Sequence, residues 1–251
     1  MQTSFLDLPD GRRIAHARSE GAEPGVVFLG GFRSDMTGTK ALFLEAWARE
    51  RGRAFLRFDY TGHGTSSGDF EQGSIGGWAR DAADAVSRLT RGPQVLVGSS
   101  MGGWIALLIA LRLPARVAAI VGVAAAPDFT EDSMWAGFDA GQRDRLMREG
   151  RVETPSEYSD DPYVITRHLI EDGRDHLVLR APLALPFPLR LLHGTADLDV
   201  PVPVALRLLA HAEGPDVRLT LVRDADHRFS APENLDLIVA TVEDVLPSPH
   251  G

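Results

Sequence analysis

A serine between two glycines, placed where an apolar strand pattern changes to an apolar helix pattern, most constrains how this chain can fold. Residues 98–102 read Gly-Ser-Ser-Met-Gly and match G-x-S-x-G, with Ser100 at the centre. Residues 94–97 are short and apolar like a buried strand, and residues 104–113 are long and apolar like a buried helix. In such a turn the serine hydroxyl is lifted above the sheet, and larger flanking side chains would crowd it. The sequence therefore predicts a serine nucleophile at the end of a buried strand.

Other turns between a strand and a helix are also rich in glycine. A dinucleotide-binding turn needs G-x-G-x-x-G, which this segment lacks. A P-loop needs Gly-Lys followed by Ser or Thr at the start of the helix, whereas here Gly103 is followed by Trp104. A plain structural turn is the remaining alternative, because so short a string also arises by chance. The nucleophile is favoured by the further motifs described below.

Strand patterns alternate with helix patterns along most of the chain. We expect strands at 3–8, 12–18, 26–29, 54–58, 94–97, 117–123, 189–192 and 217–222. Helices are expected at 40–50, 74–89, 104–113, 202–212 and 234–245. The first two strands flank Pro-Asp-Gly at 9–11 and predict a hairpin. This order predicts an α/β fold with a mostly parallel sheet covered on both faces, and a ligand site beyond the carboxyl ends of the strands.

Residues 128–188 interrupt this alternation between two expected strands. The stretch is polar, rich in Asp, Glu and Arg, and helical only in part. A structureless loop of such length is uncommon in a compact domain, although a long irregular connection is the alternative. The chain length of 251 residues suits one domain. We therefore expect a single domain over 1–251, with residues 128–188 inserted as a small helical cap over the site.

Composition excludes several classes of function. The net charge of −9 disfavours nucleic acid or an anionic membrane as the main partner. The absence of cysteine excludes disulfides, thiolate zinc sites and a cysteine nucleophile. No apolar stretch is long enough to suggest a membrane span. The first residues lack a basic segment followed by an apolar run and are too acidic for a transit peptide, so we expect a cytoplasmic protein.

A serine hydroxyl is a weak nucleophile unless a base removes its proton. Among the eight histidines, His227 follows the last expected strand, in Asp-Ala-Asp-His-Arg-Phe at 224–229. His193 stands at a strand end before Gly194 and is expected to brace its own loop, whereas His63 lies in Gly-His-Gly and is expected in a structural turn. The order serine, acid, histidine that this kind of fold uses favours His227 as the base.

The acid that orients the histidine is less sharply indicated. Asp197 and Asp199 both follow the strand that ends near 192, and Asp128 follows the preceding strand. Asp197 is favoured because it stands first where the chain turns. Asp199 is expected to cap the helix starting near Pro201. Asp128 is the third option, since a carboxylate at that strand end could also reach the histidine.

A tetrahedral oxyanion needs backbone N–H donors. The residue after the nucleophile, Met101, is expected to supply one. The second is expected from the loop after the strand at 26–29, which reads Gly30-Gly31-Phe32. Phe32 is the favoured donor, with Gly31 keeping the loop close. A simple tight turn is the alternative for the two glycines.

Taken together, these motifs resemble the serine α/β-hydrolase superfamily and, within it, the mitochondrial palmitoyl-protein thioesterases that also cleave acyl glucuronides. The resemblance runs from about residue 26 to the closing helix. The matching strings are GTKAL at 38–42, RFDY at 57–60, VGSSMGGW at 97–104, IVGVA at 120–124, RLLHG at 190–194 and DHR at 226–228. The chain departs from the relative at Gly30-Gly31-Phe32, where the relative has Pro-Gly-Tyr, and it shows no transit peptide.

The resemblance implies the α/β-hydrolase fold and a catalytic triad of Ser100, Asp197 and His227. It also implies hydrolysis of acyl esters or thioesters, with a small molecule or an S-acylated protein as substrate. We expect neither a cofactor nor a metal ion, and the oligomeric state stays open. A carbon–carbon bond hydrolase or a perhydrolase could use the same triad, and a catalytically inactive binding protein is the alternative from another class.

Overall fold

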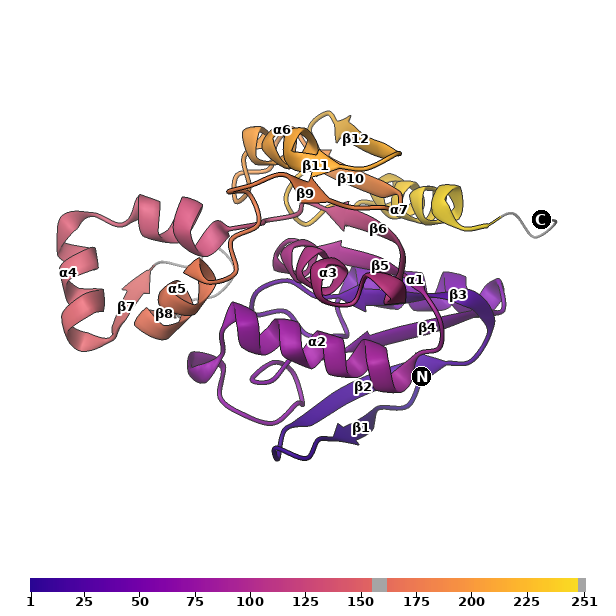
Figure 1. Ribbon diagram of the computed structural model, residues 1–251, viewed down its shortest axis with the longest axis horizontal. Helices are drawn as coiled ribbons and strands as arrows, with labels where there is room; N and C mark the ends of the chain where they lie inside the picture. Colours follow the sequence, from indigo (N-terminus) through magenta and orange to yellow (C-terminus); the bar gives the residue numbers. More distant parts are fainter. Residues whose placement is uncertain (155–161, 248–251) are drawn as a thin grey trace.

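Eight strands form one sheet in the computed structural model, which describes residues 1–154 and 162–247 (Figure 1). The strands are β1 (Ser4–Asp7), β2 (Arg13–Ser19), β3 (Ala22–Leu29), β4 (Arg53–Phe58), β5 (Gln94–Ser99), β6 (Val117–Val123), β10 (Leu189–Gly194) and β12 (Val217–Val222). Their order across the sheet is β1-β2-β4-β3-β5-β6-β10-β12. β2 pairs antiparallel with both β1 and β4, and every later pair in the sheet is parallel. The predicted hairpin and mostly parallel sheet are confirmed.

Helices cover both faces of this sheet. They are α1 (Thr39–Glu50), α2 (Ile75–Leu89), α3 (Met101–Arg112), α6 (Val202–His211) and α7 (Pro232–Val245). Side chains of α1 and α7 pack on one face, and those of α2, α3 and α6 pack on the other. Alternate residues of a strand divide between the two cores: Val95 and Val97 face α1 and α7, while Leu96 faces α3. Because both faces are buried at the centre of the sheet, β5 and β6 are mainly apolar, whereas β12 at one side of the sheet alternates between half-buried and exposed residues.

The segment between β6 and β10 is helical in part, as the sequence indicated, and it also contains strands. It contains a π-helical turn (Thr130–Trp135), α4 (Ala140–Glu149) and α5 (Arg167–Arg174). It also contains a small antiparallel sheet of β7 (Arg151–Thr154) and β8 (Tyr163–Thr166), which was not predicted. Four-residue strands give a weak periodic signal, so β7 and β8 are easily missed in a polar stretch. Residues 155–161 of the expected insertion lie outside the described part of the chain.

The inserted segment projects to one side of the sheet, at the left of Figure 1. Its return to the sheet passes through β9 (Leu183–Ala184), which pairs with β11 (Ala212–Glu213). Two short 3-10 turns, Phe70–Gln72 and Pro114–Arg116, complete the regular structure. None of the helices in residues 1–154 and 162–247 has both the length and the apolar character needed to cross a bilayer.

Candidate active site

Ser100 occupies a sharp turn between β5 and α3. Its backbone has φ +54° and ψ −119°, a conformation that non-glycine residues rarely adopt. An added Cβ on Gly98 would lie 2.3 Å from the carbonyl oxygen of Gly102, and one on Gly102 would lie 2.0 Å from that of Leu29. Real Cβ atoms do not tolerate such distances to backbone atoms. Both glycines of G-x-S-x-G are therefore required by the close approach of α3 to the sheet.

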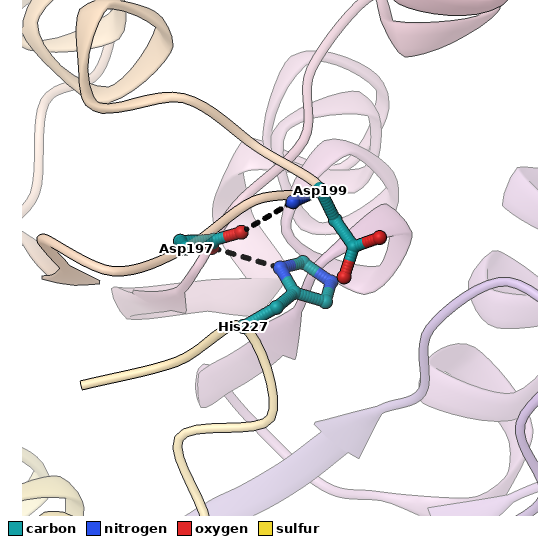
Figure 2. A group of neighbouring side chains, drawn as sticks. All are labelled: Asp197, Asp199 and His227. Carbon is teal, nitrogen blue, oxygen red and sulfur yellow. Dashed lines mark hydrogen bonds and ion pairs between the residues drawn. The ribbon is translucent and has the colours of Figure 1, made fainter. Parts of the chain in front are cut away.

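His227 links Ser100 to Asp197 by two hydrogen bonds. Its Nε2 lies 3.1 Å from the hydroxyl oxygen of Ser100. Its Nδ1 lies 2.8 Å from Oδ2 of Asp197, and Figure 2 shows this second hydrogen bond. The Asp197 side chain is fully buried, whereas that of His227 is 17% exposed. The three residues come from the ends of different strands, which meet at one edge because the strands are parallel. The structure thus brings together the serine, base and acid that the sequence singled out.

The loop after β10 fixes the orientation of Asp197. Oδ1 of Asp197 accepts hydrogen bonds from the N–H groups of Asp199, at 3.0 Å, and Val200, at 2.8 Å. Oδ2 is left for the N–H of the His227 ring. His193 Nε2 donates to the carbonyl oxygen of Val200 at 2.8 Å, so this histidine braces its own loop, as predicted. Each oxygen of Asp197 therefore has a defined partner, and the carboxylate holds the imidazole in one tautomer.

Asp128 takes a structural position away from His227. It is fully buried, and its carboxylate accepts the N–H groups of Val178, at 2.8 Å, and Leu179, at 3.0 Å. Arg180 also contacts it at 3.2 Å, while burial raises the pKa of Asp128. The residue ties the start of the inserted segment to its end. Of the three acids that the sequence offered, Asp197 is thus the one hydrogen-bonded to His227.

Asp199 does not cap α6, so that expectation is wrong. The residue before α6 is Pro201, and no side chain caps the helix. The carboxylate of Asp199 instead lies beside His227, as Figure 2 shows. The N–H of Asp199 donates to Oδ1 of Asp197, so residue 199 belongs to the turn that orients Asp197.

Asp197, Asp199 and His227 bring potential metal-ligating atoms within 4.8 Å of one another. Both oxygens of Asp197 already accept hydrogen bonds, from two backbone N–H groups and from His227. An ion bound there would have to displace the bonds that orient the carboxylate and the imidazole. The arrangement fits a hydrogen-bonded acid and base better than a metal centre.

Two backbone N–H groups beside Ser100 are available to an oxyanion. An added Cβ on Gly31 would lie 3.4 Å from the Cβ of Ser100, so the loop of residues 30–32 is in contact with the serine. Within the described part of the chain, neither the N–H of Phe32 nor that of Met101 donates a hydrogen bond. Both are the donors that the sequence predicted, and their availability agrees with that role.

A cavity of about 420 Å³ opens at Ser100 and His227. One wall is aromatic: the Phe32 ring lies 5.7 Å from that of Phe129 and 6.1 Å from that of Tyr163. Another part of the lining is polar and includes Lys40, Arg228 and Asp199. Lys40 and the aromatic residues of the inserted segment were not predicted as site residues. The string GTKAL at 38–42 contained Lys40, but nothing in a single lysine at the start of a helix indicates a cavity.

The turn containing His63 is structural, as expected. The side chain is buried and lies in edge contact with the rings of Tyr60, Phe70 and Trp78, at 5.0 to 5.5 Å between centroids. Nδ1 lies 3.3 Å from the carbonyl oxygen of Thr61. Burial lowers the pKa of His63 to about 4, so the ring is neutral at pH 7. It supports the aromatic wall from behind Phe32.

Solved structures of similar proteins share the whole fold. A putative hydrolase from Agrobacterium vitis matches with a TM-score of 0.94 and 40% identity, covering 98% of this chain and 99% of that one. The alpha/beta hydrolase domain-containing protein 10 from mouse matches with a TM-score of 0.90 and 32% identity, covering 98% of both chains. The inserted segment is therefore included in the similarity, since coverage is almost complete.

Curated relatives give the same result from the sequence. The mitochondrial palmitoyl-protein thioesterase ABHD10 of Homo sapiens is 35% identical over 244 residues, which are 97% of this chain and 79% of the relative. This relative is named as mitochondrial, so the expectation of a cytoplasmic location is wrong. That expectation rested on the lack of a recognisable signal in the first residues, and a missing signal is no physical evidence for any one compartment.

The family model agrees with these individual matches. It covers residues 26–241, from the second half of β3 through β12 and most of α7, and it includes Ser100, Asp197 and His227. The match spans most of the chain and begins at the strand before the Gly30-Gly31-Phe32 loop. The chain belongs to the alpha/beta hydrolase family.

Proposed function

We propose that this protein is a serine hydrolase that cleaves acyl esters or thioesters through an acyl-enzyme. The observation that carries the proposal is the hydrogen-bonded series Asp197–His227–Ser100, which lies at the cavity with Ser100 in a strained turn. Family membership and thioesterase-named relatives support hydrolysis of this bond class. A base within hydrogen-bond reach of a serine, itself oriented by a buried carboxylate, is the arrangement that activates a hydroxyl.

The reaction follows from the positions of these groups. Ser100 Oγ attacks the acyl carbonyl carbon while His227 Nε2 takes the hydroxyl proton. The negative charge that develops on the carbonyl oxygen is stabilised by the N–H groups of Phe32 and Met101. Collapse expels the alcohol or thiol, which receives the proton from His227. Water then attacks the acyl-enzyme with His227 as base, releasing the acid and restoring Ser100.

The aromatic wall of the cavity supports an apolar acyl group as the part of the substrate held there. The relative from Homo sapiens is named as a palmitoyl-protein thioesterase, so S-palmitoyl thioesters are the first class to test. Small acyl esters, including acyl glucuronides, use the same chemistry and form the second class. A substrate of either kind would occupy the cavity between Ser100 and the inserted segment.

The test compares Ser100→Ala with wild type on p-nitrophenyl esters of increasing chain length, a palmitoyl thioester and an acyl glucuronide. Loss of the nucleophile should lower kcat by at least about a thousandfold without changing the fold. Ser87→Ala, on the exposed side of α2, is the matched control and should retain activity. Full activity of Ser100→Ala would refute the assignment of the nucleophile.

Product analysis and a fluorophosphonate probe separate the two alternatives. A carbon–carbon bond hydrolase or a perhydrolase would give different products while still depending on Ser100. A binding protein without catalysis would leave Ser100 unlabelled by the probe and hydrolyse none of the substrates. Labelling that disappears in Ser100→Ala, together with release of the free acid, supports ester or thioester hydrolysis over both.

A further inference from the structure

Lys40 is a cation in the wall of the same cavity, on the side of His227. It begins the helix α1 together with Thr39, and both line the cavity. Its Nζ donates a hydrogen bond to the carbonyl oxygen of Arg228, the residue directly after His227. Within residues 1–154 and 162–247, Lys40 forms no ion pair with a carboxylate. An ammonium group has three N–H donors, so two are left for a further acceptor.

The charge of Lys40 is only partly compensated by its surroundings. Burial lowers its pKa to about 8, with Asp226 acting to raise the value and Arg228 to lower it. The other charged or titratable groups lining the cavity are Arg33, Asp35, Asp199, His227 and Arg228. Oδ1 of Asp35 accepts hydrogen bonds from the N–H and hydroxyl of Thr37, so that carboxylate is used locally. A half-buried ammonium without an ion pair is costly unless a ligand supplies the opposite charge.

The position of Lys40 beside the His227 loop decides which part of a substrate it would meet. The leaving alcohol or thiol takes its proton from His227 Nε2, so its heteroatom must lie within hydrogen-bond distance of that nitrogen. The aromatic wall of Phe32, Phe129 and Tyr163 belongs instead to the oxyanion loop and the inserted segment. Lys40 therefore lies on the leaving-group side, and the aromatic wall lies on the side that suits an acyl chain.

We propose that Lys40 binds an anionic group, a carboxylate or a phosphate, carried by the leaving group of the substrate. The proposal rests on the proposed hydrolase function and narrows its substrates to acyl donors with an anionic alcohol or thiol part. The protein as a whole carries a net charge of −9, so an anionic leaving group would gain from a cation at the cavity. Lys40 offers a local site where a charge-assisted hydrogen bond offsets that repulsion.

Two esters with the same acyl group test the proposal: 4-butyryloxybenzoate, which is anionic, and 4-butyryloxybenzamide, its neutral isostere. The readout is the ratio of their kcat/KM values, which cancels effects common to both. Lys40→Met should lower this ratio about tenfold relative to wild type, mainly through KM, because one charge-assisted hydrogen bond is lost. Lys40→Arg keeps the cation and should retain most of the preference. A purely structural role of Lys40 would lower both rates equally, and an unchanged ratio in Lys40→Met would overturn the proposal.

Binding to wild-type protein gives a second test that depends neither on a folded variant nor on turnover. Dissociation constants of 4-methoxybenzoate and 4-methoxybenzamide are measured by calorimetry at pH 7 and pH 9.5. The preference for the carboxylate should be present at pH 7 and fall as Lys40 loses its proton above about pH 8. Equal affinities at pH 7 would overturn the anion site. Failure of the hydrolase proposal would show separately, as no turnover of either ester and no labelling of Ser100.

Discussion

Two regions border the cavity: the carboxyl ends of the parallel strands, where Ser100 lies, and the inserted segment. Different interactions hold these two regions in place. At the sheet edge, α3 approaches β3 so closely that a Cβ on Gly102 would lie 2.0 Å from a backbone oxygen. The inserted segment packs apolar side chains such as Leu169 and Ile170 into the core, and charged side chains add further connections near its surface. Asp132 pairs with Arg180 and Arg207, and Trp135 lies 4.6 Å from the guanidinium of Arg174.

One region holds the side chains proposed to react, and the other contributes part of the cavity lining. The reacting groups need fixed positions, and close backbone packing in a buried sheet supplies them. Polar contacts between partly exposed side chains hold an element less firmly, because water competes for them and salt screens them. The inserted segment contributes Phe129 and Tyr163 to the cavity, so under the proposed function its position would affect which acyl group fits there.

The largest expected effect is a loss of stability on replacing a glycine, and two glycines, one in each region, test the contrast. Gly102→Ala should destabilise the protein by about 4 kcal/mol or more, because the added methyl group meets the backbone of Leu29 and neither side can give way. Gly137→Ala, in the inserted segment, is the control: a Cβ there meets nothing within 4 Å, and the change should stay within about 0.5 kcal/mol. Urea denaturation followed by circular dichroism measures both. Similar losses in the two variants would show that the packing contrast is not the source of rigidity.

The sheet and the reacting groups could be predicted because their signals are local. Apolar runs identify the strands, and β6 and β12 begin and end at the predicted residues, although only β6 is buried along most of its length. Chain order then narrowed the candidate residues for the acid and the base, since parallel strands bring their carboxyl ends to the same side of the sheet. Even so, residue type alone left Asp128, Asp197 and Asp199 as candidates. Only the three-dimensional positions show that Asp128 holds the inserted segment and that Asp197 contacts His227.

The inserted segment and the cavity lining could not be predicted to the same degree. The π-helical turn at Thr130–Trp135 has no distinct sequence pattern, and β7 and β8 are too short to show a period. Lys40 belongs to the wall because α1 begins next to the His227 loop, a contact between residues far apart in the chain. Such contacts depend on the assembled fold, so a single sequence carries no direct sign of them.

A second prediction concerns acid stability on the sheet side of the cavity. His63 has a pKa of about 4 in the folded protein against an ordinary 6.5, so the unfolded chain binds a proton first as the pH falls. The stabilising effect is complete above pH 6.5 and is lost as the pH falls towards 4. The shift corresponds to about 3 kcal/mol. Urea denaturation between pH 7 and pH 4 should show this loss in wild type.

His63→Phe removes the titration while keeping a ring among Tyr60, Phe70 and Trp78. The difference in unfolding free energy between pH 7 and pH 4 should therefore be smaller in the variant by about 3 kcal/mol. Comparing the two pH profiles cancels the contributions of all other groups that titrate in both proteins. Parallel profiles would mean that His63 can charge within its aromatic surroundings and that this side of the cavity is less rigid than proposed.

The smallest predicted change is made where the two regions join. Asp128→Asn keeps the size of the side chain but replaces one of the two carboxylate oxygens by an NH2 group, so the N–H of either Val178 or Leu179 loses its acceptor. The lost hydrogen bond is charge-assisted, but a neutral side chain is also easier to bury, since burial already raises the pKa of Asp128. We expect a net loss of about 2 kcal/mol in the free energy of unfolding, with faster proteolysis inside 128–188.

Asp132→Asn breaks only partly exposed ion pairs and should cost less than about 1 kcal/mol. If Asp132→Asn were as costly as Asp128→Asn, the surface ion pairs would carry the attachment, and the inserted segment should then loosen in high salt.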